Sequence, residues 1–241
     1  MSNVNAKPIR IGFATIGQAP RSDSVPAIVA ALGQPVEVIE AGGLDGLSDE
    51  QIAQLGPREG EYTFATRLAD GRQVVLGKSA AEARLVPVLE RMDQQNLDLV
   101  VALCAGTSLP ALKNSLLIEP QRIVDGITAG LAAACRRIGI VVPLAQQVER
   151  FHLEGEVTAQ VRVTHASPYE GDRFFEAGRE LADCDLVVMH CMGYTADMRA
   201  KVASGAGVPT VSAPELVAAV LRQLIERPRT TTAPASLPAN D

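Results

Sequence analysis

Short apolar runs alternate with longer stretches of mixed polarity along most of the chain, which is typical of α/β proteins with parallel sheets. The expected strands are 9–15, 35–41 and 97–103, followed by 137–142, 157–165, 184–190 and 208–212. Helical stretches begin at Pro120 and Pro214, and proline is favoured in the first turn of a helix. The hydrophobic pattern therefore predicts an α/β fold class.

Two of these apolar runs have nearly the same sequence. DLVVALCAG covers 98–106 and DLVVMHCMG covers 185–193, and each has a cysteine followed two residues later by a glycine. Arg-Ile-Gly also occurs twice, at the start of an expected strand, from Arg10 and from Arg137. The repeat predicts two pseudo-duplicated parallel-sheet α/β domains with an interdomain cleft.

The repeat also sets the expected domain limits. They are an N-terminal domain at 1–120 and a C-terminal domain at 121–212, with the last helix, 214–226, joining the first domain. The segment 61–78 has no counterpart in the second half. It contains two β-like runs joined at Asp70-Gly71, which predicts an inserted hairpin, because both turn positions tolerate positive φ.

The tail at 228–241 is rich in Thr, Ala and Pro. It lacks the large apolar residues needed to offset the entropy of folding, so we expect it to be disordered.

Composition narrows the function further. The chain has 47% hydrophobic and 21% charged residues, as globular proteins do, and a net charge of −6, which argues against a nucleic-acid partner. Its start lacks the apolar core of a signal peptide, and no apolar run approaches the roughly 20 residues that span a bilayer. We therefore expect a cytoplasmic protein with no membrane partner, and leave a homodimer open.

The four cysteines are expected to be thiols in such a compartment. Cys135 lies in an apolar helix and Cys184 at the entry of a strand, so both are expected to be structural. No C-x-x-C pair occurs and the chain has only three histidines, so no metal site is expected. No glycine-rich nucleotide loop occurs either, so the expectation is that there is no cofactor.

Cys104 and Cys191 directly follow equivalent apolar strands. Ligands of open α/β sheets bind beyond the carboxyl ends of strands, so we expect the two thiols on opposite walls of one cleft. One thiolate could remove the α proton of a small carboxylate, and the opposite thiol could return a proton to the other face. The base must be a thiolate, and we expect a helix N-terminus to lower its pKa towards neutrality.

The expected substrate-binding residues also follow strand ends. They are Gln18, Arg21, Glu40, Gly106, Thr107, Ser108, Gln146, Gly193, Tyr194 and Thr195. The glycines would let the backbone approach a ligand, and the hydroxyl groups would donate hydrogen bonds. Arg21 could hold a second carboxylate in a bidentate contact, or could pair with Asp23 at a helix entry. His190 is not expected to pair with Cys191, because neighbours on a strand point to opposite faces.

Five ordered motifs resemble the AroM family and cover nearly the whole chain except the tail. They are TIGQAPRSD (15–23), EAGGLDGLS (40–48), LCAGTSLPALKNSLLIEPQRI (103–123), IVVPLAQQ (140–147) and VVMHCMGYTADMR (187–199). That family looks like a branch of the aspartate/glutamate/hydantoin racemase superfamily. The resemblance implies two similar α/β domains that each supply a catalytic cysteine to the cleft. By that resemblance Cys104, Thr107 and Cys191 carry over, together with Tyr194 and Thr195.

The expected function is a cofactor-independent racemase or isomerase. It would move the α proton of a small carboxylate, such as an amino acid, a hydantoin or a related acid, between two cysteines. Two alternatives remain open. One is a decarboxylase of the same fold that uses Cys191 alone, and the other is a non-catalytic protein that binds a small acid.

Overall fold

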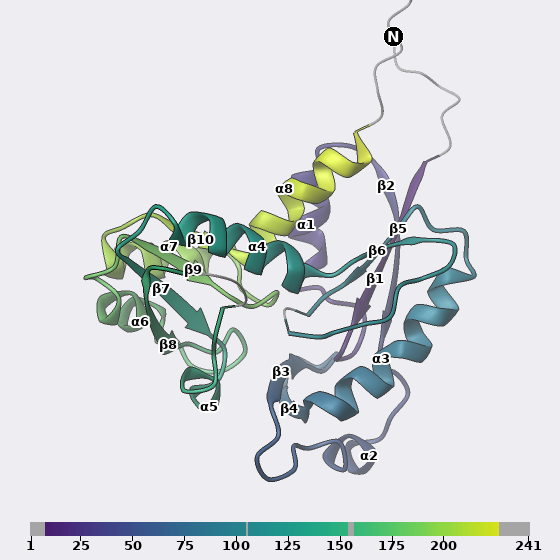
Figure 1. The fold of residues 1–241 in the computed structure, drawn as a ribbon. Coiled ribbons are helices and arrows are strands. Elements are labelled where there is room, and N and C mark those ends of the chain that lie inside the picture. The colour runs from purple at the N-terminus through teal and green to yellow at the C-terminus, as the bar shows by residue number, and fades with distance from the viewer. Residues whose placement is uncertain (1–7, 105, 154–156, 227–241) are drawn as a thin grey trace, which may run out of the picture.

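The computed structural model describes residues 8–104, 106–153 and 157–226, and these residues form two lobes, each built on a four-stranded parallel sheet (Figure 1). The sheet of the N-lobe has the order β2-β1-β5-β6, with β1 Ile9–Thr15, β2 Val36–Gly42, β5 Leu99–Ala102 and β6 Leu116–Ile118. The sheet of the C-lobe has the order β8-β7-β9-β10, with β7 Arg137–Val142, β8 Gln160–His165, β9 Leu186–Met189 and β10 Thr210–Ser212. The predicted fold class is confirmed, because the second sheet repeats the strand order of the first.

The repeated Arg-Ile-Gly and Asp-Leu-Val-Val sequences make the same strand pairing in both lobes. Ile11 is paired with Leu99 in the N-lobe, and Ile138 is paired with Leu186 in the C-lobe. The repeated aspartates accept hydrogen bonds from backbone N–H groups at the repeated arginines, at 2.8 Å from Arg10 and 2.9 Å from Arg137. The duplicated sequence therefore encodes a duplicated start of the central strand pair.

Side chains of the repeated strands alternate between two cores, as the period of a β-strand requires. On β5, Leu99 and Val101 lie in one core while Val100 and Ala102 lie in another, which they share with helix α3 (Lys78–Asp93). On β9, Val188 belongs to the first of these cores, whereas its neighbours Val187 and Met189 belong to a third. The same alternation continues into the two segments that carry Cys104 and Cys191.

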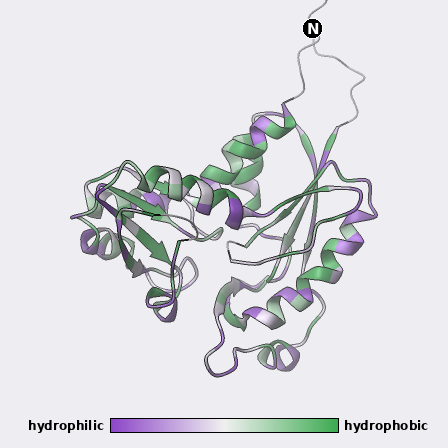
Figure 2. Ribbon diagram, in the orientation of Figure 1, coloured by the Kyte–Doolittle hydropathy of each residue, from purple (hydrophilic) through white to green (hydrophobic). Residues whose placement is uncertain are grey.

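The first core is continuous across both lobes. It contains residues of both sheets and of three helices, α1 (Val25–Leu32), α4 (Pro120–Ala132) and α8 (Ala213–Ile225). These helices lie between the lobes in Figure 1, and α1 and α8 are largely apolar in Figure 2. Helix α8 returns to the N-lobe, where the side chain of Gln34 donates a hydrogen bond to the carbonyl of Ile225. The shared core explains how two sheets can be held at a fixed distance.

An antiparallel hairpin extends from the N-lobe. It consists of β3 (Thr63–Arg67) and β4 (Gln73–Gly77), and Gly71 has a φ of +96° in the turn between them. The remaining helices are α2 (Asp49–Ala53), α5 (Ala145–Val148), α6 (Phe174–Glu180) and α7 (Ala196–Ala206). The hairpin lies beside α3 and extends the N-lobe towards the C-lobe, so it can form one wall of a site between the lobes (Figure 1).

The domain limits at 1–120 and 121–212 stay a prediction, and the expected disordered tail at 228–241 lies outside the described residues. Within residues 8–104, 106–153 and 157–226, no helix is both long and apolar enough to cross a membrane.

Candidate active site between the lobes

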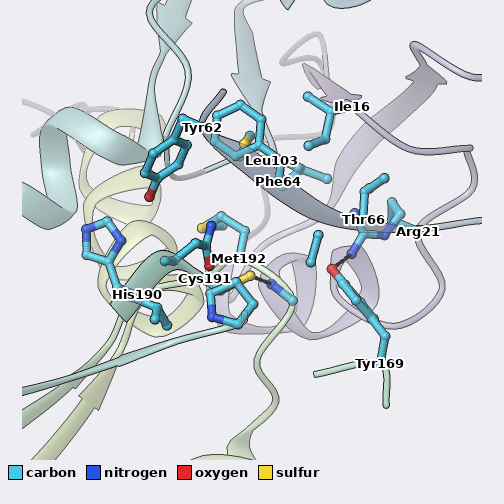
Figure 3. A pocket seen from close by; sticks show the side chains of 16 residues that line it. Ile16, Arg21, Tyr62, Phe64, Thr66, Leu103, Tyr169, His190, Cys191 and Met192 are labelled. Atoms are coloured by element: carbon cyan, nitrogen blue, oxygen red, sulfur yellow. Dashed lines mark hydrogen bonds between the residues drawn. The ribbon is translucent and has the colours of Figure 1, made fainter. Parts of the chain in front are cut away.

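Cys104 and Cys191 line the same buried cavity, which lies between the two lobes (Figure 3). The N-lobe contributes Ile16, Arg21, Tyr62, Phe64, Ala65, Thr66, Leu103 and Cys104, and the C-lobe contributes Val142, Pro143, Gln147, Tyr169, His190, Cys191, Met192 and Gly193. The free volume is about 30 Å³, which is room for one or two water molecules. The cavity therefore holds little free space beside the two thiols.

The two cysteines occupy equivalent positions in the two lobes. Cys104 continues the side of β5 that carries Val100 and Ala102, and Cys191 continues the side of β9 that carries Val187 and Met189. Cys104 is buried, whereas Cys191 is partly accessible. The sequence repeat thus brings one thiol from each lobe to a common space, as expected from the strand ends.

The expected lowering of the thiol pKa is wrong for this arrangement. Burial raises the pKa of Cys191 from 9.0 to about 11, although the backbone N–H of Gly193 and the charge of Arg21 oppose the rise. Burial and the neighbouring Cys191 raise the pKa of Cys104 further. The helix that follows Cys191 begins only at Ala196, so the thiol does not lie in its first turn. Both groups are therefore thiols at neutral pH.

Gly106 and Gly193 each lie against an aromatic side chain, and each also lines a cavity, Gly193 the thiol cavity and Gly106 a second cavity beside it. A Cβ on Gly193 would lie 2.3 Å from the hydroxyl oxygen of Tyr169, and a Cβ on Gly106 would lie 2.4 Å from Cε1 of Phe64. Both aromatic residues line the thiol cavity. The repeated glycines therefore let one ring from each lobe close over the site.

Arg21 reaches the cavity, but its guanidinium is largely occupied. Nε and Nη2 donate to the two carboxylate oxygens of Asp23 at 2.8 and 2.7 Å, and Nη1 donates to Thr15 Oγ1 at 3.0 Å. Nη2 also donates to the Tyr169 hydroxyl at 2.9 Å, which links the two lobes (Figure 3). The bidentate partner of Arg21 is thus Asp23, which is the second of the two alternatives that the sequence left open.

Gln18 and Glu40 shape the loops behind the cavity and do not line it. Gln18 accepts a hydrogen bond from the backbone N–H of Ala69, next to the hairpin turn. Glu40 accepts a hydrogen bond of 2.7 Å from the backbone N–H of Arg21. These two predicted site residues position the Arg21 loop and the hairpin.

Of the two glutamines after β7, Gln147 lines the cavity and Gln146 is exposed. Gln147 donates to the backbone carbonyl of Thr63 at 2.8 Å, and Gln146 donates to the Thr63 hydroxyl at 3.2 Å. Both side chains therefore hold the hairpin of the N-lobe against the C-lobe.

The four predicted hydroxyl donors lie outside this cavity. Thr107 and Ser108 line a second cavity that adjoins it. Tyr194 is buried in the core of the C-lobe, where its hydroxyl donates to the carbonyl of Ala166 at 2.9 Å, and Thr195 caps α7 by accepting from the N–H of Met198. The expectation that Tyr194 and Thr195 face the site is not met, because the turn after Gly193 directs both into the packing around α7.

His190 pairs with a residue that the sequence did not single out. Its Nε2 lies 2.8 Å from Oδ1 of Asp125, which is buried on α4, and the ring of Phe151 packs edge-on against it. His190 therefore does not serve as the partner of Cys191, in agreement with the expected alternation. Asp125 could have been found from the sequence, because an acidic residue on the buried face of an apolar helix indicates a buried polar partner.

Three hydroxyl-bearing residues of the lining were also missed, namely Tyr62, Thr66 and Tyr169. They come from the hairpin and from the segment after β8, where the sequence has no repeated pattern. Thr66 Oγ1 is buried and makes no hydrogen bond to any described residue. Within the part of the chain that the structure describes, no group of three or more His, Cys, Asp or Glu side chains could hold a metal ion.

The fold and the site together define a two-lobed α/β protein with a cysteine-lined cleft. The chain belongs to the AroM family, since the family described as AroM protein matches residues 11–225. A search of curated proteins finds no match.

Solved structures share the fold at low sequence identity. Allantoin racemase from Pseudomonas fluorescens has a TM-score of 0.54 and 18% identity, over 90% of this chain and 91% of that chain. A maleate cis-trans isomerase variant from Nocardia farcinica, with a covalently bound succinylcysteine intermediate, has a TM-score of 0.51 and 14% identity. The match covers 90% of this chain and 93% of that chain. A liganded arylmalonate decarboxylase mutant has a TM-score of 0.51 and 17% identity, over 89% and 92%.

Proposed function

We propose that this protein is a cofactor-independent racemase or isomerase that transfers the α proton of a small acid between Cys104 and Cys191. The observation that carries the proposal is the meeting of two thiols from equivalent strand ends in one buried cavity. The solved structures that share the fold include a racemase and a cis-trans isomerase of small molecules, which supports this class of reaction.

The two thiols differ in a way that suggests their order of action. Cys191 has the lower pKa of the pair, because the Gly193 N–H donates to its sulfur at 3.4 Å and the Arg21 charge is nearby. It is the thiol that ionises first. The Cys191 thiolate would take the α proton and become a thiol, and the Cys104 thiol would give its proton to the opposite face of the carbanion and become the thiolate.

Hydroxyl groups in the cavity can stabilise the carboxylate while the carbanion forms. The Tyr169 hydroxyl accepts from Arg21, so its own hydrogen remains available for donation. The unpartnered Thr66 Oγ1 is a second donor from the opposite lobe. Hydrogen bonds from donors that are already in place stabilise negative charge strongly in a site without water. We therefore infer that the carboxylate of the acid would lie near the Tyr169 hydroxyl and Thr66.

We infer that a substrate reaches the thiols when the hairpin moves away from the C-lobe. The thiol cavity has a free volume of only about 30 Å³, and the hairpin is held by polar contacts with the C-lobe. They include Gln147 to the carbonyl of Thr63 and Arg150 to the carbonyls of Gly60 and Glu61. Such contacts are readily exchanged for water, so the hairpin serves as a lid over the thiols.

A decarboxylase remains the second candidate, favoured by the apolar lining of the cavity. Ile16, Phe64 and Leu103 surround the thiols, and apolar surroundings destabilise a carboxylate relative to neutral CO2. In this reaction Cys191 would stay a thiol in the resting state and protonate the enediolate.

Incubation in heavy water with a panel of acids tests the proposal. The panel contains both enantiomers of amino acids and of hydantoins, together with substituted malonates. The proposal predicts incorporation of deuterium at the α carbon and loss of optical activity for at least one panel member. CO2 release from a malonate, without exchange of any other acid, would instead support the decarboxylase. If the protein binds members of the panel tightly but catalyses neither reaction with any of them, the result would support the non-catalytic binding protein.

A further inference from the structure

A second cavity adjoins the cavity that holds the thiols, and Tyr62 and His190 line both. In Figure 3 these two side chains lie on the same side of the thiol cavity, opposite Arg21 and Tyr169. The second cavity, here called the outer cavity, has a free volume of about 230 Å³. It is therefore much roomier than the thiol cavity, and a molecule that reaches the thiols past Tyr62 can extend into it.

The outer cavity gathers positive charge among the residues that the structure describes. Its lining includes the cations Lys78 and Arg150 beside two histidines, His152 and His190, and, within residues 8–104, 106–153 and 157–226, neither Asp nor Glu. This sign of charge is unexpected on a chain with a net charge of −6. A concave surface that gathers one sign of charge raises the local concentration of ligands of the opposite sign.

The two main cations of this cavity are weakly neutralised. Arg150 donates from Nη1 to the neutral carbonyls of Gly60 and Glu61 and forms no ion pair with any described residue. Lys78 lies 3.8 Å from a carboxylate oxygen of Glu82, which is long for an ion pair, and the same oxygen accepts a hydrogen bond of 2.8 Å from the Ser108 N–H. Both cations therefore keep most of their capacity to bind an anion.

Neutral polar groups complete the lining. The Thr107 hydroxyl is buried and makes no hydrogen bond to any described residue. Gln121 donates to Asp125, and its side-chain oxygen has no partner among the described residues. Burial, the neighbouring Cys191 and the negative charge of Glu82 raise the pKa of Cys104, and the positive charges of Arg21 and Lys78 oppose that rise, so Lys78 is within electrostatic reach of Cys104. The outer cavity thus combines charge and hydroxyl donors close to the reacting centre.

We propose that the outer cavity binds a second anionic group of the substrate, held by Lys78 and Arg150 and separated from the reacting carbon by the passage between Tyr62 and His190. The substrate is then an extended acid that has its α carbon between the thiols and a carboxylate or phosphate several bonds away. Which end of the molecule reacts rests on the function proposed above. The binding of an anion in the outer cavity does not.

The test is a calorimetric comparison of binding by two matched series of compounds. Unbranched α,ω-dicarboxylates from succinate to suberate are compared with monocarboxylates of the same chain length, and ω-phosphonocarboxylates distinguish phosphate from carboxylate recognition. Wild type is compared with Lys78→Gln, Arg150→Gln and the control Arg91→Gln, which removes an exposed cation from the same helix as Lys78. Melting temperatures verify that each variant is folded.

We expect the dianions of one chain length to bind about ten-fold or more tightly than the matched monocarboxylates, since a hydrogen bond to a charged group contributes about 1.5–3 kcal/mol. Lys78→Gln and Arg150→Gln should each remove most of this preference, and Arg91→Gln should keep it. Equal affinity for the two series, or a preference that survives both substitutions, would overturn the proposal. Binding of dianions by a protein that exchanges no α proton would refute the proposed reaction and leave the outer cavity as an anion site.

Discussion

Arg21 of the N-lobe donates a hydrogen bond of 2.9 Å to the hydroxyl of Tyr169 in the C-lobe. The bond crosses the cleft beside Cys191, and Asp23 fixes the guanidinium that makes it. It joins the two lobes through residues that also line the thiol cavity. The same contact therefore joins the two lobes and forms part of the wall of the thiol cavity.

Replacement of Tyr169 by Phe should weaken binding of a small acid about five- to ten-fold, because one hydrogen bond contributes about 1 kcal/mol or slightly more. The ring and its packing stay in place, so the melting temperature should fall little. Tyr194→Phe is the matched control, since it removes a hydrogen bond of 2.9 Å to Ala166 in the core of the C-lobe, away from the cavity. Titration calorimetry measures both variants. A loss of affinity of the same size in Tyr194→Phe would contradict the role given to Tyr169.

Alanine at Gly193 or Gly106 should displace the ring that each glycine accommodates. The new Cβ would lie 2.3 Å from the Tyr169 hydroxyl or 2.4 Å from Phe64 Cε1, so ring or backbone must shift, at about 1–3 kcal/mol. Gly126→Ala on α4 is the control, because its Cβ would meet no heavy atom within 4 Å apart from its chain neighbours and the backbone of its own helix, and Ala favours the helix. The free energy of unfolding in urea should be lower for the Gly193→Ala and Gly106→Ala variants and not lowered for the Gly126→Ala control. Unchanged stability and affinity in Gly193→Ala would show that the ring does not need this space.

Alkylation of Cys191 should become faster with pH well into the alkaline range. The reactive species is the thiolate, and burial raises the pKa of this thiol to about 11. Between pH 7 and pH 10 the rate constant should rise about ten-fold per pH unit and level off only near pH 11. Mass spectrometry of iodoacetamide-treated protein resolves the modification of each cysteine. A plateau at or below pH 9 would show that the thiol is activated in the resting protein.

Asp125→Ala should destabilise the protein by about 1–3 kcal/mol, because it leaves the buried Nε2 of His190 without its partner at 2.8 Å. Asp125→Asn can still accept a hydrogen bond and should recover part of the loss. The free energy of unfolding in urea measures both. If Asp125→Ala is as stable as wild type, the pair is not a structural contact between α4 and the segment after β9.

The repeated strands could be predicted because their strand pairing and core packing depend on residues that recur in the same order in both halves of the sequence. Asp98 and Asp185 start the same strand pairing, and the apolar residues after them alternate between two cores. The positions of Cys104 and Cys191 on a common cavity follow from that symmetry. The position of a cysteine directly after the same strand in each lobe was sufficient to predict where the two thiols lie.

The remainder of the site depends on contacts between segments that have no shared pattern. Tyr169 reaches the cavity only because the chain after β8 turns towards Arg21, and Tyr62 only because the hairpin folds over the cleft. Gly193 gave a clue to a close approach but not to its cause, which is an aromatic ring. The thiol pKa also depends on burial by both lobes, which outweighs the amide and the positive charge near Cys191.

Proton exchange by the two cysteine variants tests the central claim most directly. Cys104→Ala and Cys191→Ala are each incubated in heavy water with both enantiomers of a substrate found in the panel, and deuterium at the α carbon is followed by NMR. A two-thiol mechanism predicts that neither variant inverts the substrate, and that each exchanges the α proton of one enantiomer only, with opposite preferences. Full activity of Cys104→Ala together with an inactive Cys191→Ala would contradict the two-thiol mechanism.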